Sequence, residues 1–274
     1  MKTLILLLLP LFVFSQHTEE QKIIIKEKLA HYYAKTAEVR LFSQARQKYI
    51  DSILMIDHYN AYLWQQKAMP LFKQKKYELG LQYLDSAIKY DQTNHYFEYK
   101  AFMKCIFVKN YKEAIKDFEL VKIKNKNGFV MDHSYDFYIG LSYLQLNQFQ
   151  KAEEFLKSSI EYSELKWKEA HYVEYFYLGL IEMEQEKLSE ANYFLDKAIS
   201  FYKEFPDALY YKAQLLELQN KNTEAKQLIE QAISNLSKGY SINEDNARYE
   251  EYPYQIKKEW LTIELEIINK KLGE

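Results

Sequence analysis

The sequence is poor in residues that break helices or cross-link the chain. Among its 274 residues there are six glycines, four prolines and one cysteine. Because a single cysteine cannot form an intramolecular disulfide, disulfides are excluded as a source of stability in any compartment. The scarcity of Gly and Pro, together with abundant Leu, Ile, Ala, Glu, Lys and Gln, predicts long helices with short loops and leaves no obvious place for strands.

The chain also lacks an excess of either charge. Its 37 Lys and Arg residues nearly balance 39 Asp and Glu residues, for a formal net charge of −2. A near-neutral chain with mixed signs has no electrostatic footprint for nucleic acid, so we expect no nucleic-acid partner. Tyrosine, in contrast, is abundant at 26 residues, and it suits positions where a ring is buried and a hydroxyl stays wet.

Motifs for catalysis are absent as well. The sequence has no Gly-rich phosphate loop, no HExxH zinc helix and no GxSxG nucleophile elbow. The histidines are scattered, with no two at metal-ligand spacing on one helix. Asp57-His58 and Asp132-His133 fall where turns are expected, which favours solvated loop residues, and Cys105 lies in an apolar stretch that predicts a buried thiol without a redox role. We therefore predict no catalytic residue, no metal, no cofactor and no enzymatic activity.

One apolar run stands at the start of the chain. Residues 1–15 combine a charged start at Lys2, an apolar stretch over Leu4–Phe14 and a small residue, Ser15, before the polar Gln16. This order is typical of a secretory signal peptide. The run is about half of the roughly 20 residues that span a bilayer, which makes a membrane anchor the weaker alternative. We expect cleavage near Ser15, export to the periplasm or the medium, and no integral membrane segment afterwards.

A pair of small residues twelve positions apart recurs five times along the chain. The pairs are Ala68 and Gly80, Phe102 and Ala114 (imperfect at Phe102), Gly140 and Ala152, Gly179 and Ala191, and Ala213 and Ala225. The second members follow one another at intervals of 34 to 39 residues. A period of this size is typical of stacked helical hairpins.

The unit from Tyr172 to Phe205 shows how each repeat is built. Apolar and small residues at three- and four-residue steps predict one helix through Gly179 and a second through Ala191, with a polar turn at 185–187. Gly179 and Ala191 are small because the two antiparallel helices approach closely there, and Ala198 plays the same part against the next unit.

This pattern of a large residue, Leu-Gly and Tyr, followed by Ala, an aromatic or Leu, and Ala, resembles that of the tetratricopeptide-repeat family. Five units from about Ala61 to about Gly239 carry it, and a degenerate sixth covers Lys26 to Asn60. The family's terminal Pro is missing from nearly all units. The resemblance implies an all-α, right-handed superhelical solenoid of stacked antiparallel helix hairpins.

The organisation predicted from these patterns has four parts. They are a signal peptide at 1–15, N-terminal helices with a degenerate repeat at 16–60, five repeats at 61–239, and a loop with a C-terminal capping helix at 240–274. Two units are longer than the others, at Lys122–His133, where a surface loop is expected, and at Tyr162–His171, where a longer helix is expected.

The last helix is predicted to be amphipathic. Its apolar residues at helical spacing are Ile256, Trp260, Ile263, Ile267 and Leu272. We expect this face to cover the exposed apolar end of the last repeat, as solenoids require. The alternative is that the tail folds back into the concave side.

The family resemblance implies that the first helices of the repeats line a concave surface where partner peptides bind. The residues that fall on this surface by phase, and that form our candidate partner-binding groove, are Met69, Tyr99, Met103, Phe137, Leu141, Phe176, Leu180 and Tyr210. Their apolar character would suit an amphipathic helix or an extended apolar peptide. The alternative is that they belong to the core of the solenoid.

Three functional hypotheses follow from these observations. The first is an exported, non-catalytic scaffold that binds a protein or peptide through the apolar groove. The second is a self-associating structural or assembly factor of the cell envelope, at most a weak homo-oligomer, with the C-terminal helix as cap or regulator. The third, an enzyme or small-molecule binder, has no motif in its favour.

Overall fold

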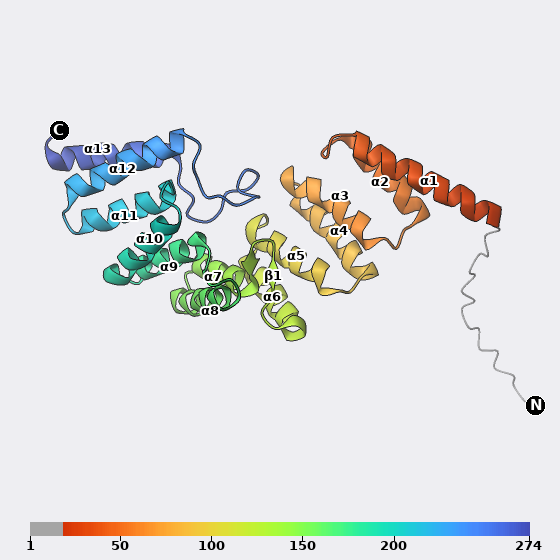
Figure 1. The fold of residues 1–274 in the computed structure, drawn as a ribbon, viewed down its shortest axis with the longest axis horizontal. Coiled ribbons are helices and arrows are strands. Elements are labelled where there is room, and N and C mark those ends of the chain that lie inside the picture. The colour runs from red at the N-terminus through yellow and green to blue at the C-terminus, as the bar shows by residue number, and fades with distance from the viewer. Residues whose placement is uncertain (1–18) are drawn as a thin grey trace, which may run out of the picture.

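The computed structural model describes residues 19–274, which form thirteen helices and one pair of short strands (Figure 1). The helices are α1 (Glu19–Glu38), α2 (Gln44–Ile56), α3 (Ala61–Lys73), α4 (Tyr77–Tyr90), α5 (Asn94–Ile106), α6 (Tyr111–Asn125), α7 (Tyr135–Gln145), α8 (Phe149–Trp167), α9 (Tyr172–Glu184), α10 (Leu188–Phe201), α11 (Pro206–Leu218), α12 (Asn222–Ser237) and α13 (Lys258–Leu272). The expected signal peptide lies outside the described residues.

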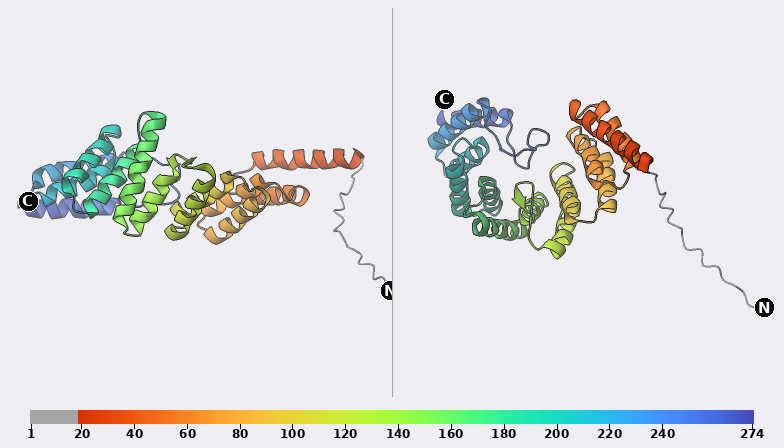
Figure 2. Two further views of the ribbon diagram at one scale, coloured as in Figure 1. Left: turned by 90° about the horizontal axis from the view of Figure 1, so that it is seen from below. Right: turned by 45° about the vertical axis from the view of Figure 1, so that its right-hand side comes forward.

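Consecutive helices pair as antiparallel hairpins, and the hairpins stack into a curved solenoid. Figure 2 shows the curvature most clearly, with the N-terminal and C-terminal helices on opposite arms of an arc. The prediction of an all-α solenoid of stacked hairpins is therefore confirmed. The chain between α12 and α13, residues 238–257, leaves the stack and runs across the concave side of the arc (Figures 1 and 2).

Small residues stand where paired helices come closest. A Cβ added at Gly179 of α9 would lie 2.9 Å from Leu195 Cγ of α10, and one at Gly140 of α7 would lie 2.9 Å from Leu156 Cγ of α8. Such separations are shorter than real Cβ contacts, so no larger residue fits without displacing the partner helix. The spacing of twelve residues thus marks the contact within each hairpin.

The two long units differ from the others in the ways expected, with one addition. In the first, the loop after α6 contains the strands β1 (Phe129–Val130) and β2 (His133–Ser134), which pair antiparallel. The expectation that the chain has no strands is wrong at this point. In the second, α8 extends over 19 residues, five more than α10. The Phe129 and Tyr162 rings stack at 5.3 Å, so the loop and the helix extension contact each other.

The last helix, α13, packs against α12 and ends the solenoid as a cap. Its buried residues are Leu261 and Ile268, whereas Trp260, Ile263 and Ile267 are exposed. The predicted contact face is therefore wrong. The helix carries apolar residues on two sides, and the side with Leu261 and Ile268 is the one that meets α12.

We predict that Gly179→Val lowers the free energy of unfolding by about 1–3 kcal/mol, because the new side chain overpacks the contact with Leu195. Urea unfolding followed by circular dichroism measures the change. Ser189→Val, at an exposed position of α10, serves as the control and should change stability by no more than about 0.5 kcal/mol. Equal losses in the two variants would contradict the close-approach explanation.

Candidate functional site

The concave side of the solenoid is occupied by the chain itself. Seven of the eight predicted groove residues have buried side chains, namely Tyr99, Met103, Phe137, Leu141, Phe176, Leu180 and Tyr210, and Met69 is half-buried. Helices α7 and α9 pack against neighbouring helices, and on the concave side α9 also contacts residues 240–256, which we call the C-terminal segment. The seven residues thus belong to the core, and the expectation of an open groove through the middle repeats is corrected.

The backbone of the C-terminal segment is held by side chains of α9 and α11. Two backbone N–H groups of the segment donate to side chains: that of Asn243 to the Tyr172 hydroxyl (2.7 Å) and that of Ile256 to Asp207 Oδ1 (2.8 Å). Two tyrosine hydroxyls donate to backbone carbonyls of the segment: Tyr177 to that of Pro253 (3.0 Å) and Tyr211 to that of Tyr254 (3.1 Å). Bonds to the main chain do not depend on the sequence of the bound segment. The concave face therefore has the chemistry of a surface that binds non-helical polypeptide through its main chain.

Apolar and ionic contacts complete the docking of the segment. Ile242, Tyr252 and Ile256 are buried in the same core as the repeat helices. Between Ile242 and Tyr252, Glu250 accepts a hydrogen bond from the Tyr77 hydroxyl of α4 (2.5 Å) and pairs with Lys109 (3.0 Å). The segment thus contacts both α4 and α11.

A cluster of ionisable side chains lies beneath the segment. The ring of His133, fully buried, has its Nε2 3.1 Å from Glu244 Oε1 and its Nδ1 3.8 Å from Glu174 Oε1. The Nδ1 of His171 lies 3.7 Å from the same Glu244 oxygen, and the two histidine rings are 5.1 Å apart. The interpretation of His133 as a solvated turn residue is wrong, because β2 turns it inward.

The electrostatics of the cluster separate the two histidines. Burial alone would lower the pKa of His133, but the carboxylates of Glu244 and Glu174 outweigh it and raise the pKa to about 9. Burial, reinforced by the charge on His133, lowers the pKa of His171. Sequence reasoning missed this cluster because His133 and Glu244 are 111 residues apart, and the one available signal was that both histidines end an over-long unit.

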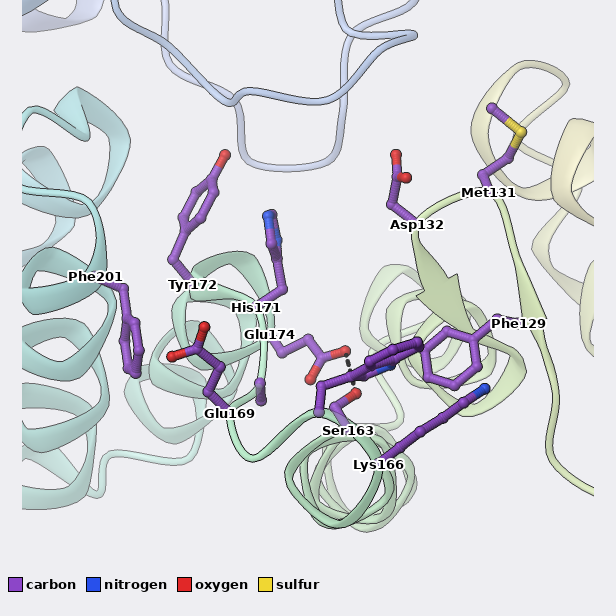
Figure 3. A pocket seen from close by; sticks show the side chains of 12 residues that line it. Phe129, Met131, Asp132, Ser163, Lys166, Glu169, His171, Tyr172, Glu174 and Phe201 are labelled. Carbon is purple, nitrogen blue, oxygen red and sulfur yellow. Dashed lines mark hydrogen bonds between the residues drawn. The ribbon is translucent and has the colours of Figure 1, made fainter.

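Two cavities flank the cluster. The first, of about 550 Å³, lies between the β1–β2 loop, the end of α8 and the start of α9. In Figure 3 the side chains of Asp132, His171 and Tyr172 point from its wall toward the C-terminal segment. The two long units of the repeat therefore build the walls of one cavity, with the exposed Trp167 at its edge.

The second cavity, of about 420 Å³, lies between the first repeats and the C-terminal segment. Its walls include Met69 and Lys73 of α3 and Tyr99 of α5 on one side, and Arg248 and Tyr249 of the segment on the other. We call it the N-terminal cavity. It is the part of the predicted groove that the segment leaves accessible.

Asp207 links the pH dependence of stability to the segment. Its burial raises its pKa to about 7, although the backbone N–H of Ile256 donates to it and opposes the shift. The neighbouring ionisable groups, the hydroxyls of Tyr172, Tyr177 and Tyr211, all have raised pKa values and stay neutral near pH 7. The carboxyl is therefore the group that changes charge at this contact.

We predict that Asp207→Asn increases stability at pH 8 and has little effect at pH 4. A carboxyl whose folded-state pKa is raised favours folding below its unfolded pKa, and this contribution is lost as the pH rises through about 7. The amide oxygen of Asn keeps the acceptor for Ile256. Urea unfolding of both proteins at pH 4, 6 and 8 tests this, and a difference between them that is constant with pH would rule it out.

The fold is similar to that of several solved structures. PilW, described as a widely conserved type IV pilus biogenesis factor, aligns with a TM-score of 0.61 at 16% identity, over 78% of this chain and 94% of PilW. A tetratricopeptide repeat protein from Parabacteroides merdae aligns with a TM-score of 0.60 at 16% identity, over 89% and 98%. MamA from Desulfovibrio magneticus RS-1 gives 0.55 at 16% identity, over 65% and 96%.

No protein-family profile matches the chain, and no curated protein matches it. Within residues 19–274, none of the helices has the length and apolarity that crossing a membrane requires. At identities of 16% the structural likeness concerns the fold. The repeat spacing, the stacked hairpins and these similarities agree that the chain is an all-α solenoid with the fold of tetratricopeptide-repeat proteins.

Proposed function

We propose that this chain is an exported, non-catalytic scaffold that binds a protein or peptide partner at its concave side. The observation that carries the proposal is that α9 and α11 already hold a piece of non-helical polypeptide, the C-terminal segment, through its main chain. The partner docks beside this segment, in the N-terminal cavity, where Met69 and Tyr99 of the predicted groove line an accessible wall.

The N-terminal cavity has the mixed lining that peptide recognition needs. Met69 offers apolar surface beside the edge of the largely buried Tyr99 ring, and the charged lining combines Lys73 and Arg248 with Glu244 and Asp245. The Lys73 ammonium lies 4.3 Å from the centre of the Tyr249 ring, so the cation is positioned by the segment. A partner segment with one apolar side chain flanked by polar or charged groups fits this arrangement.

A non-catalytic role is supported by the burial of Cys105, the only cysteine of the chain. The Cys105 thiol is buried, and burial raises its pKa to about 12. A thiol of this kind is protonated at neutral pH and is a poor nucleophile. Export is supported by the order of residues at 1–15, and N-terminal sequencing of the protein from envelope and secreted fractions, with Gln16 as the expected first residue, tests it.

We predict that the double variant Met69→Asp, Lys73→Glu weakens partner binding at least tenfold, because it places two new negative charges in the N-terminal cavity. The mature chain from Gln16 serves as bait for partners in the envelope and secreted fractions, and the affinity of each captured partner is then measured by calorimetry. Substitutions at Phe137 or Phe176 are unsuitable, because both are fully buried.

The matched control is Ile123→Asp, at a position of α6 that is 80% exposed and outside the cavity. This variant adds a negative charge without changing the concave side, so its affinity for each captured partner should equal that of the unaltered chain. Equal weakening by the control, or full binding by the double variant, would place the partner elsewhere on the molecule.

Self-association is the second candidate function, favoured by the outer face of α13. Trp260, Ile263 and Ile267 are 40%, 56% and 40% exposed and lie on one side of the helix. A partly exposed apolar stripe of this kind is suited to a second copy. The C-terminal helix would then act as an assembly surface as well as a cap.

For this candidate we predict that the mature chain associates with rising concentration and that Ile263→Lys keeps it monomeric. The variant should fold normally, since the side chain is exposed. Sedimentation velocity over a hundredfold range of concentration measures both proteins. A monomer at every concentration for the unaltered chain would eliminate self-association and leave α13 as a simple cap.

A further inference from the structure

Three segments that are far apart in the sequence place metal-ligating atoms at one point. His133 belongs to β2, His171 precedes α9 as its N-cap, and Glu244 lies in the C-terminal segment. One nitrogen of each histidine and one carboxylate oxygen of Glu244 all lie within 4.8 Å of one another. Two imidazoles and one carboxylate are a ligand set that zinc and related divalent transition metals accept.

The separations between these atoms match those of a metal site. Bonds of about 2.0–2.2 Å in a tetrahedral zinc site imply distances of about 3.3–3.5 Å between ligand atoms. The Glu244 oxygen lies 3.1 Å from His133 Nε2 and 3.7 Å from His171 Nδ1. These two distances lie on either side of the ideal, and the two histidine nitrogens lie within 4.8 Å of each other, so the site forms when side-chain rotations bring the imidazoles together.

Glu174 supplies the support that a metal-binding histidine needs. Its Oε1 lies 3.8 Å from His133 Nδ1, the nitrogen that faces away from Glu244. Ser159 and Ser163 donate hydrogen bonds to the same oxygen and fix the carboxylate. Both His133 Nδ1 and Glu174 Oε2 are buried without a hydrogen-bond partner among the described residues. A modest rotation would pair them as carboxylate and histidine, the usual outer arrangement of a metal site.

The charge balance of the cluster also favours a cation. Within residues 19–274, the ion-pair partners of Glu174 and Glu244 are the two histidines, with no lysine or arginine. Asp132 adds an exposed carboxyl on the wall of the first cavity. Two buried carboxylates, those of Glu174 and Glu244, face the two imidazoles, and a divalent ion would stabilise this arrangement.

We propose that His133, His171 and Glu244 bind a divalent transition-metal ion of the zinc class, with Glu174 as a positioning residue for His133. His171 lies on the wall of the first cavity beside Asp132, so this cavity gives the ion a route from solvent. The ion joins the C-terminal segment to β2 and to the start of α9. It thus fastens the segment in place, a function beyond partner docking.

The test uses the mature chain, stripped with a chelator and titrated with zinc chloride by calorimetry, with the bound metal counted by mass spectrometry. We expect one zinc per chain with a dissociation constant below about 10 μM. His171→Ala, at a side chain that is 40% exposed and therefore tolerant of truncation, should weaken binding at least a hundredfold. Glu244→Gln keeps the size of the side chain and should weaken it at least tenfold.

The matched control is His95→Ala, whose exposed side chain lies on α5 outside the cluster, and it should bind zinc as the unaltered chain does. Glu174→Gln should keep one zinc per chain with affinity lowered about 10- to 100-fold, as expected of an outer partner. Zinc should also slow proteolysis within the C-terminal segment of the unaltered chain and leave that of His171→Ala unchanged. No saturable binding, or binding that survives His171→Ala, would overturn the proposal.

Discussion

The docking of the C-terminal segment across the concave side is the interaction on which the rest of this structure depends. In a solenoid each hairpin touches its neighbours alone, so stability normally spreads through nearest-neighbour contacts. Here the segment contacts α4 through Glu250 and α11 through Ile256. Contacts between such distant repeats tie their stabilities together. We expect the solenoid to unfold more cooperatively than a repeat array that lacks such a tie.

The hairpins were predictable because two closely packed helices require small residues at a fixed spacing in the sequence. Gly179 and Ala191 must be small, and their spacing is the same in each hairpin. The docking of the C-terminal segment has no such sequence pattern, since its backbone is held by tyrosines that ordinary repeats also contain. The predicted contact face of α13 is wrong for a related reason. Apolar residues lie on both sides of this helix, and only its packing against α12 shows that Leu261 is buried and Trp260 is not.

The cluster around His133 shows how the irregular parts of a repeat sequence can hold its special chemistry. The sequence predicts a loop in one over-long unit and a longer helix in the other, and the structure has both. What the sequence could not supply is that these insertions meet, as the stacked rings of Phe129 and Tyr162 show. Once they meet, His133 and His171 become neighbours under Glu244. Departures from local regularity are where functional sites are expected.

The abundance of tyrosine has its explanation on the concave face. Tyr172, Tyr177 and Tyr211 bury their rings among the helices and direct their hydroxyls to the backbone of the segment. If the segment left, these hydroxyls would meet water and lose little, because tyrosine tolerates a wet end. An aliphatic face would instead expose apolar surface at a large cost. The buried side chains of Ile242, Tyr252 and Ile256 nevertheless oppose release of the segment, and an ion at Glu244 would add to a docking that these apolar contacts already favour.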